Sequence, residues 1–131
     1  MILADTSVWV DYFNGFRNWQ TDVLHAALGR ETVLMGDLIL MEVLQGFRSQ
    51  RDFLTARQYF SLLEYHSLCS SALALQGAEH YRSLRRKGVT VRKTIDVVIG
   101  TWCIANGVAL LHHDRDFDPM VEHLDLPVVT P

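Results

Sequence analysis

Short apolar runs alternate with longer segments of helical spacing along most of this chain. The runs at residues 2–4, 32–35, 66–68 and 108–111 have the length of β-strands, and residues 127–129 suggest a fifth strand at a sheet edge. Between them, the spacing predicts helices over residues 8–13, 19–28, 38–47, 52–65, 71–87 and 95–106, and a short helix that ends at residue 124. The alternation predicts an α/β fold, with a short parallel sheet of four to five strands covered by helices on both faces.

Polar residues and glycines mark the ends of several predicted helices. Asp37 is expected to cap the helix over residues 38–47, and Thr94 the helix over residues 95–106, because short polar side chains accept hydrogen bonds from first-turn amides. Gly88 follows the helix predicted over residues 71–87, and Gly107 follows the helix over residues 95–106, at positions where glycine tolerates a positive φ. These residues support the element limits drawn from the apolar pattern.

The bulk composition fits a single globular domain spanning residues 1–131. The chain has 49% hydrophobic residues, 21% charged residues and a net charge of −3. No apolar run approaches the roughly 18 residues that span a bilayer, and no basic segment precedes the first apolar run as in a secretion signal. We therefore expect a cytoplasmic protein with no membrane contact. Its two cysteines, Cys69 and Cys103, are expected to be reduced core residues, and Trp9 and Trp102 are expected in the core as well.

Acidic residues follow or interrupt apolar segments at four places. Asp5 follows the first predicted strand and the pair Asp114 and Asp116 follows the fourth, whereas Glu42 and Asp96 lie in otherwise apolar helices. The carboxyl ends of parallel strands meet at one edge of a sheet, where ligands bind. Buried carboxylates are costly without a partner, and a cluster of them suits Mg²⁺ or Mn²⁺. The pattern therefore indicates a metal-dependent phosphodiesterase.

Each acid also has a structural interpretation that the sequence leaves open. Asp5 is a favoured helix N-cap, although Thr6 and Ser7 can cap equally well. Asp96 lies in the first turn of its helix, where a carboxylate interacts favourably with the helix dipole. Glu42 could face a gap in which solvent reaches the helix.

Half of the basic residues lie in one short segment. Six of the twelve Lys and Arg residues fall within residues 82–93, directly before Asp96. They could be a solvated helix end, where cations are favoured, or a basic rim that holds an RNA backbone beside the acids. On the second interpretation, the RNA-binding residues are Arg85, Arg86, Arg92 and Lys93.

Four motifs in order along the whole chain resemble the PIN-domain family, and within it the VapC toxins of bacterial toxin–antitoxin pairs. The motifs are Ile-Leu-Ala-Asp-Thr-Ser-Val-Trp-Val at 2–10, Leu-Met-Glu-Val-Leu-Gln-Gly-Phe at 40–47, Thr-Ile-Asp-Val-Val-Ile-Gly-Thr at 94–101 and Leu-Leu-His-His-Asp-Arg-Asp-Phe at 110–117. One departure is His113, at a position of variable identity before the acid.

This resemblance implies a three-layer α/β/α sandwich with Mg²⁺- or Mn²⁺-dependent endoribonuclease activity on structured RNA, either transfer or ribosomal RNA, that inhibits translation. It also implies a homodimer and a VapB-like antitoxin that blocks the site in a hetero-oligomer. The site residues that it carries over are Asp5, Asp96 and Asp114 as metal ligands, Glu42 and Asp116 as further acids, and Thr6 and Ser7 as supporting residues.

Two other protein classes share the pattern of a small parallel sheet with acids at strand ends. A phospho-accepting receiver domain needs an acid pair after the first strand and a lysine after the last, and a haloacid-dehalogenase-like phosphatase needs Asp-x-Asp after the first strand. The chain has Asp5-Thr6-Ser7 there and no lysine near its end. A non-catalytic metal-binding signalling or interaction module remains an alternative.

Overall fold

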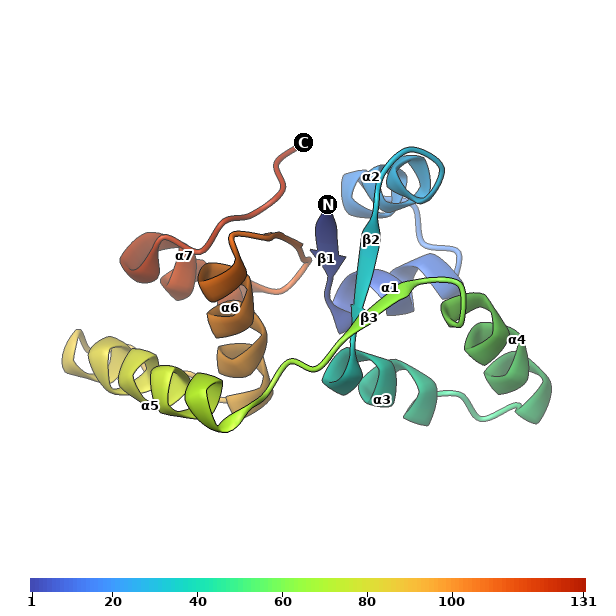
Figure 1. The fold of residues 1–131 in the computed structure, drawn as a ribbon. Coiled ribbons are helices and arrows are strands. Elements are labelled where there is room, and N and C mark those ends of the chain that lie inside the picture. Colours follow the sequence, from blue (N-terminus) through green and yellow to red (C-terminus); the bar gives the residue numbers. More distant parts are fainter.

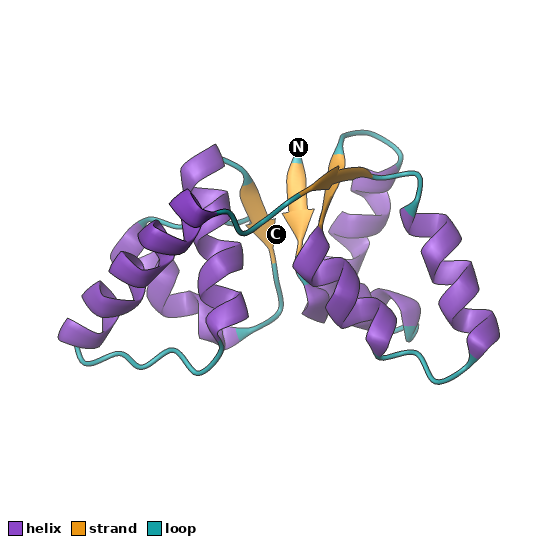
Figure 2. Cartoon of the chain, turned by 60° about the horizontal axis from the view of Figure 1, so that its bottom comes forward, coloured by secondary structure: helices purple, strands orange, loops and turns teal.

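The computed structural model describes residues 1–131 and has a four-stranded parallel sheet in the order β3-β2-β1-β4. Helices α2, α3 and α4 lie on one side of the sheet, and α5, α6 and α7 lie on the other (Figure 1, Figure 2). The predicted three-layer sandwich is therefore confirmed.

The strands are short and the helices make up most of the chain. The strands are β1 (Ile2–Ala4), β2 (Val33–Gly36), β3 (Glu64–His66) and β4 (Ala109–Leu111). The helices are α1 (Thr6–Phe13), α2 (Trp19–Leu28), α3 (Asp37–Gln45), α4 (Gln50–Phe60), α5 (Ser71–Arg86), α6 (Thr94–Asn106) and α7 (Asp118–Leu124), with a 3₁₀ turn η1 (Arg115–Phe117). None of these helices combines the length and the apolar character that crossing a membrane requires.

The central strand β1 explains why the apolar runs are uninterrupted. Leu3 pairs with Leu34 of β2 on one side and with Leu110 of β4 on the other, and all three side chains are fully buried. Because helices cover both faces of a parallel sheet, consecutive residues of a central strand must all be apolar. The apolar pattern of the sequence therefore locates the two inner strands, β1 and β2, and also β4.

The core confirms most of the predicted burial and corrects one residue. Trp9 and Trp102 are both buried, as is Cys103. The prediction that Cys69 is a core residue is wrong, because Cys69 lies in the irregular segment between β3 and α5 and is exposed.

Sheet pairing moves the boundaries predicted around the third strand. The helix predicted to reach residue 65 ends at Phe60, and β3 covers Glu64–His66 where residues 66–68 were expected. Tyr65 pairs with Met35 of β2, so hydrogen bonds to a neighbouring strand outweigh the local helical spacing. The fifth strand expected at residues 127–129 is reduced to a single bridge between Leu110 and Val128.

Two predicted caps are also corrected. The N-cap of α3 is Gly36, and Asp37 lies in the first turn, where its Oδ1 accepts hydrogen bonds from the Leu38 and Leu68 amides. Asp37 thus ties α3 to the segment after β3. The N-cap of α6 is Lys93, one residue before Thr94. The predicted stop of α6 at Gly107 is confirmed, with a left-handed φ of 63°.

Candidate metal centre

The carboxyl-terminal ends of β1 and β4 lie side by side, and each leads into acidic residues. The Asp5 amide donates a hydrogen bond to the Leu111 carbonyl at 3.0 Å, so Asp5 is level with the end of β4. Asp114 follows β4 and caps the 3₁₀ turn η1. The expectation that strand ends bring these distant acids to one edge of the sheet therefore matches the observed geometry.

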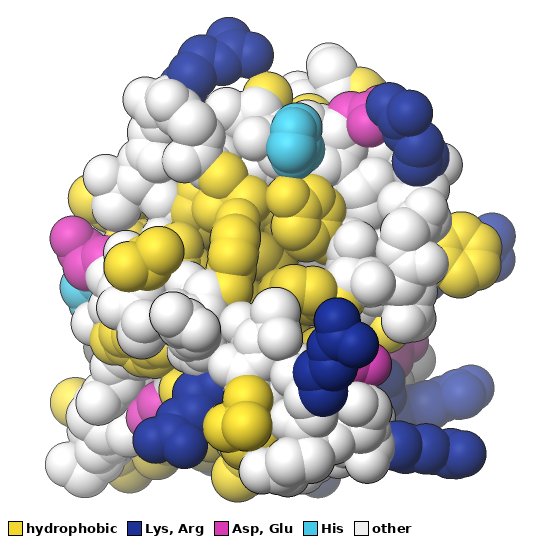
Figure 3. Space-filling model, turned by 90° about the vertical axis from the view of Figure 1, so that its right-hand side faces the viewer, with side chains coloured by type: hydrophobic (Ala, Val, Ile, Leu, Met, Phe, Trp, Pro, Cys, Tyr) yellow, Lys and Arg dark blue, Asp and Glu magenta, His cyan; other side chains and the backbone are white.

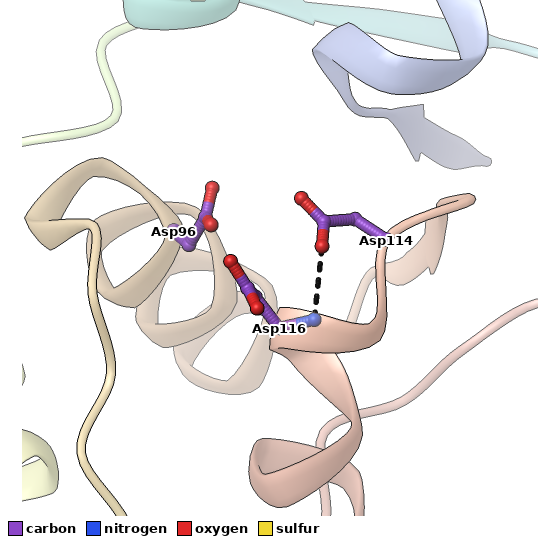
Figure 4. Close-up of side chains that lie close together, drawn as sticks. All are labelled: Asp96, Asp114 and Asp116. Carbon is purple, nitrogen blue, oxygen red and sulfur yellow. Dashed lines mark hydrogen bonds between the residues drawn. The ribbon is translucent and has the colours of Figure 1, made fainter.

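Three carboxylates meet at this edge. Asp96, Asp114 and Asp116 each offer one oxygen, and the three oxygens lie within 4.8 Å of one another. Figure 4 shows Asp96 on α6 facing Asp114 and Asp116, which come from the segment after β4. The Asp116 amide donates to Asp114 Oδ1 at 2.9 Å, which fixes the spacing of these two acids. Oxygen ligands in this number and arrangement suit a hard divalent cation.

Asp96 carries the clearest sign of a missing partner. The residue is 7% exposed, and its Oδ2 is buried without any hydrogen bond. Burial is the main cause that raises the pKa of Asp96 to about 6, and repulsion from Asp114 adds to it while Lys93 opposes it. Buried carboxylate oxygens are normally paired or bound to a metal, so the residues present fit a divalent ion.

Asp5 is more deeply buried than Asp96 but lies outside the group of three oxygens. It is 3% exposed and caps α1, accepting hydrogen bonds from the Ser7 hydroxyl at 2.6 Å and the Val8 amide at 3.4 Å. Burial raises the pKa of Asp5 to about 7, against the lowering effect of these hydrogen bonds, and repulsion from Asp114 and Asp96 contributes. Asp5 therefore combines the capping role with a place next to the cluster. Asp116 takes the third position in the group.

Glu42 reaches the same region from α3. The Thr6 hydroxyl donates to Glu42 Oε1 at 2.7 Å, and the charge of Glu42 raises the pKa of Asp96. Thr6 and Ser7 were expected to be supporting residues. In the structure their hydroxyl groups orient Glu42 and Asp5, because both residues lie in the first turn of α1 beside these acids.

Removing the Thr6 hydroxyl tests the position of Glu42. We expect Thr6→Val to weaken Mg²⁺ binding about 10-fold, since residues that hold acids around a metal typically contribute that much to its affinity. Titration calorimetry measures this change. Thr55→Val is the matched control, because the Thr55 hydroxyl bonds only to the Arg51 carbonyl on exposed α4. Equal Mg²⁺ affinity in the Thr6 variant and the native chain would show that the Thr6–Glu42 bond has no part in metal binding.

The basic segment is divided between two locations. Lys93 Nζ lies 3.8 Å from Asp114 Oδ2, at the acids. Arg85 and Arg86 lie at the end of α5 farthest from the start of α6 (Figure 1), and Arg85 stacks on Tyr81 at 5.8 Å. Arg92 is exposed in the loop that leads back to α6. Of the four predicted RNA-binding residues, only Lys93 contacts the acidic cluster.

One hydrogen-bond network at the site had no signal in the sequence. Asp11 Oδ2 accepts from His113 Nδ1 at 3.1 Å, and the His113 amide donates to the Ser7 hydroxyl at 3.0 Å. Ser7 in turn holds Asp5. Residues 11 and 113 are 102 positions apart, so only the tertiary fold reveals that they link α1 to the segment that carries Asp114.

Comparisons with known proteins show the family of this chain. The PIN domain family model matches residues 2–121. A VapC ribonuclease of Mycobacterium bovis and the ribonuclease VapC11 of Mycobacterium tuberculosis are each 32% identical over 120 residues, which is 90% of this chain and 90% of theirs.

The fold is also similar to a solved structure. VapBC2 from Rickettsia felis, bound to a DNA fragment from its promoter, contains a chain that superposes with a TM-score of 0.78 at 19% identity, covering 98% of both chains. The family model covers most of the chain and the relatives are 32% identical over 90% of it, and the chain therefore belongs to the PIN-domain family.

Proposed function

We propose that this chain, as one nuclease domain spanning residues 1–131, is a metal-dependent endoribonuclease toxin of a toxin–antitoxin pair. It hydrolyses phosphodiester bonds in structured RNA, either transfer or ribosomal RNA, in the cytoplasm. Translation is thereby inhibited until the antitoxin neutralises the enzyme. The observation that carries the proposal is the buried, unpartnered Oδ2 of Asp96 beside the carboxylates of Asp114 and Asp116. The similarity to VapC ribonucleases supports RNA as the substrate.

The acids divide into residues that hold the ion and residues that surround it. Asp96, Asp114 and Asp116 would hold Mg²⁺ or Mn²⁺, with Asp5 and Glu42 adding negative charge around it. A bound divalent ion lowers the pKa of water and offsets the charge that develops on the phosphate. The hydrogen bonds from Ser7 and Thr6 keep Asp5 and Glu42 oriented before the substrate arrives, which avoids reorganisation during the reaction.

Basic residues attract the substrate to this acidic edge. Lys93 places a cation next to Asp114, where a phosphate of the RNA backbone approaches. Arg85, Arg86 and Arg92 are exposed and hold more distant phosphates of a long RNA. The net charge of −3 makes such local cations necessary, because the molecule as a whole repels RNA.

A VapB-like antitoxin is the protein partner in this proposal, with the toxin as a homodimer inside a hetero-oligomer. The aromatic side chains of α1 and α4 pack edge to face, and Tyr12, Phe13 and Tyr59 remain partly exposed. Figure 3 shows apolar side chains gathered in the middle of the face on this side of the molecule. Exposed apolar area of this kind supports a protein interface.

Incubation of total cellular RNA with antitoxin-free protein tests the proposed activity. We expect discrete fragments with Mg²⁺ or Mn²⁺, none with chelator, and recovery of the fragments when the metal is returned in excess. Discrete fragments indicate selectivity for certain sites, and their sequences identify the RNA. Intact RNA in every lane, from a protein shown to be folded, would overturn the proposal and favour the non-catalytic interaction module.

A further inference from the structure

A cavity of about 410 Å³ opens directly beside Asp114. It lies between the first turn of α2, the segment after β4 and the end of the chain, and its walls include Trp19, Gln20, His113, Arg115 and residues 128–131. Asp114 belongs both to this cavity and to the three-acid group. A group bound in the cavity is therefore a neighbour of whatever is bound at the acids. The volume lies in the range of small-molecule binding sites.

The walls of the cavity are held in place relative to the acids. Asp11 Oδ2 accepts hydrogen bonds from Asn18 Nδ2 at 3.2 Å and from His113 Nδ1 at 3.1 Å. Asn18 is the N-cap of α2 and forms a capping box with Thr21. Through these bonds the first turn of α2, which carries Trp19 and Gln20, is fixed to the segment that carries Asp114.

Two side chains of the cavity are available to contact a bound group. Trp19 is 37% exposed, whereas Trp9 and Trp102 are buried in the core. Gln20 is only 7% exposed, yet its amide makes no side-chain hydrogen bond to the rest of the chain and lines the cavity. The buried side-chain polar atoms without a partner are Trp9 Nε1 and Asp96 Oδ2, so the Gln20 amide reaches the solvent of the cavity and is available to a bound group. The exposed indole of Trp19 offers a flat surface for stacking.

We infer that this cavity binds the base of an unpaired nucleotide next to the scissile phosphate, with the base stacked on Trp19 and its edge read by the Gln20 amide. The inference rests on the proposed ribonuclease function. An amide side chain offers both a donor and an acceptor, as base edges require, and proteins read single-stranded RNA by stacking bases on aromatic rings. Asp114 and Asp118 also line the cavity, and their two negative charges outnumber the single positive charge of Arg115, so a neutral base fits better than a phosphate.

The test combines protein variants with RNA that lacks one base. RNA fragments that contain the cleavage site in its native secondary structure carry a single abasic nucleotide at one of the unpaired positions around the cut, and KM and kcat are measured with Mg²⁺. For the native chain we expect one position next to the cut where the missing base raises KM roughly 10-fold. In Trp19→Ala that penalty disappears, because the stacking surface is gone, and in Trp19→Phe it is largely restored. Gln20→Leu is expected to change which base is preferred at the same position.

Controls separate this cavity from general effects. Tyr65→Ala removes an aromatic side chain that is 44% exposed on β3, and it should leave the abasic penalty unchanged. Quenching of tryptophan fluorescence by the native RNA in chelator gives a readout that does not depend on turnover. The part of the quenching that Trp19→Phe removes belongs to Trp19, since Trp9 and Trp102 remain in that variant, and this part should be absent with the abasic RNA. Equal abasic penalties in the native chain and Trp19→Ala, with unchanged cleavage sites in Gln20→Leu, would overturn the inference while leaving the ribonuclease activity standing. Failure of the native chain to cleave any RNA would remove both.

Discussion

Asp96→Asn is expected to lower the rate of RNA cleavage at least about 100-fold while the protein stays folded. Residues that only support metal ligands typically contribute 10- to 100-fold, and Asp96 supplies the buried oxygen that has no other partner. Asparagine keeps the size of the side chain but removes its charge. The loss should appear in kcat with both Mg²⁺ and Mn²⁺, measured on a defined RNA fragment, with circular dichroism reporting the fold.

The matched control for this prediction is Asp52→Asn. Asp52 also lies in the first turn of a helix, α4, but it is exposed and belongs to no group of acids. The Asp52→Asn variant should cleave RNA at the native rate, since losing a charge at the start of α4 affects only the first turn of that helix. Native activity in Asp96→Asn would mean that the acids at this sheet edge are not the catalytic centre, and the proposed mechanism would have to be abandoned.

The metal-free protein is expected to lose stability as the pH rises from about 4 to about 7. The pKa of Asp5 is raised from 3.8 to about 7, and that of Asp96 to about 6, in both cases mainly by burial. The folded chain therefore holds more protons than the unfolded chain across this range, and the free energy of unfolding falls with increasing pH. Below the range both states are protonated, and the full stability is present.

A divalent metal should reverse this loss. At pH about 8, in the metal-free protein, the ionised acids repel one another. Compared with that sample, protein with free metal at about 100 times its dissociation constant should have a Tm that is higher by roughly 10 °C. Asp5→Asn should flatten the pH dependence, because asparagine still caps α1 but cannot ionise. Asp52→Asn should behave as the native chain. A Tm that is independent of both pH and metal would show that burial and mutual repulsion of the ionised acids do not destabilise the folded protein.

Local pattern was sufficient for most of the fold. The apolar runs located β1, β2 and β4, because strands covered on both faces must be apolar at consecutive positions. Glycine located the end of α6 at Gly107, where the backbone adopts a left-handed φ. The pattern misplaced β3, in which Glu64 and Tyr65 are exposed and only His66 is partly buried, and which becomes a strand through pairing with β2.

The same distinction applies to the site. Asp5, Glu42, Asp96 and Asp114 were recognisable because a carboxylate in an apolar segment is unusual, and because parallel strands end at a common edge. The sequence did not show which of the acids lie closest together. In the structure the oxygens within 4.8 Å of one another belong to Asp96, Asp114 and Asp116, and Asp5 is not in this group. The sequence also did not show which basic residues lie near the acids. Arg85 and Arg86 lie at the far end of the long helix α5, away from the acids, whereas Lys93 lies beside them.

Sequence periodicity was thus enough to predict a parallel α/β fold, since strand and helix patterns are local. That acids converge could also be predicted, because parallel strands end at a common edge of the sheet. The tertiary structure alone decided which acids meet, how Thr6 and Ser7 hold Glu42 and Asp5, and how Asp11 joins Asn18 to His113. These contacts link residues up to 102 positions apart. Their partners are chosen by the packing of whole elements, which no local pattern encodes.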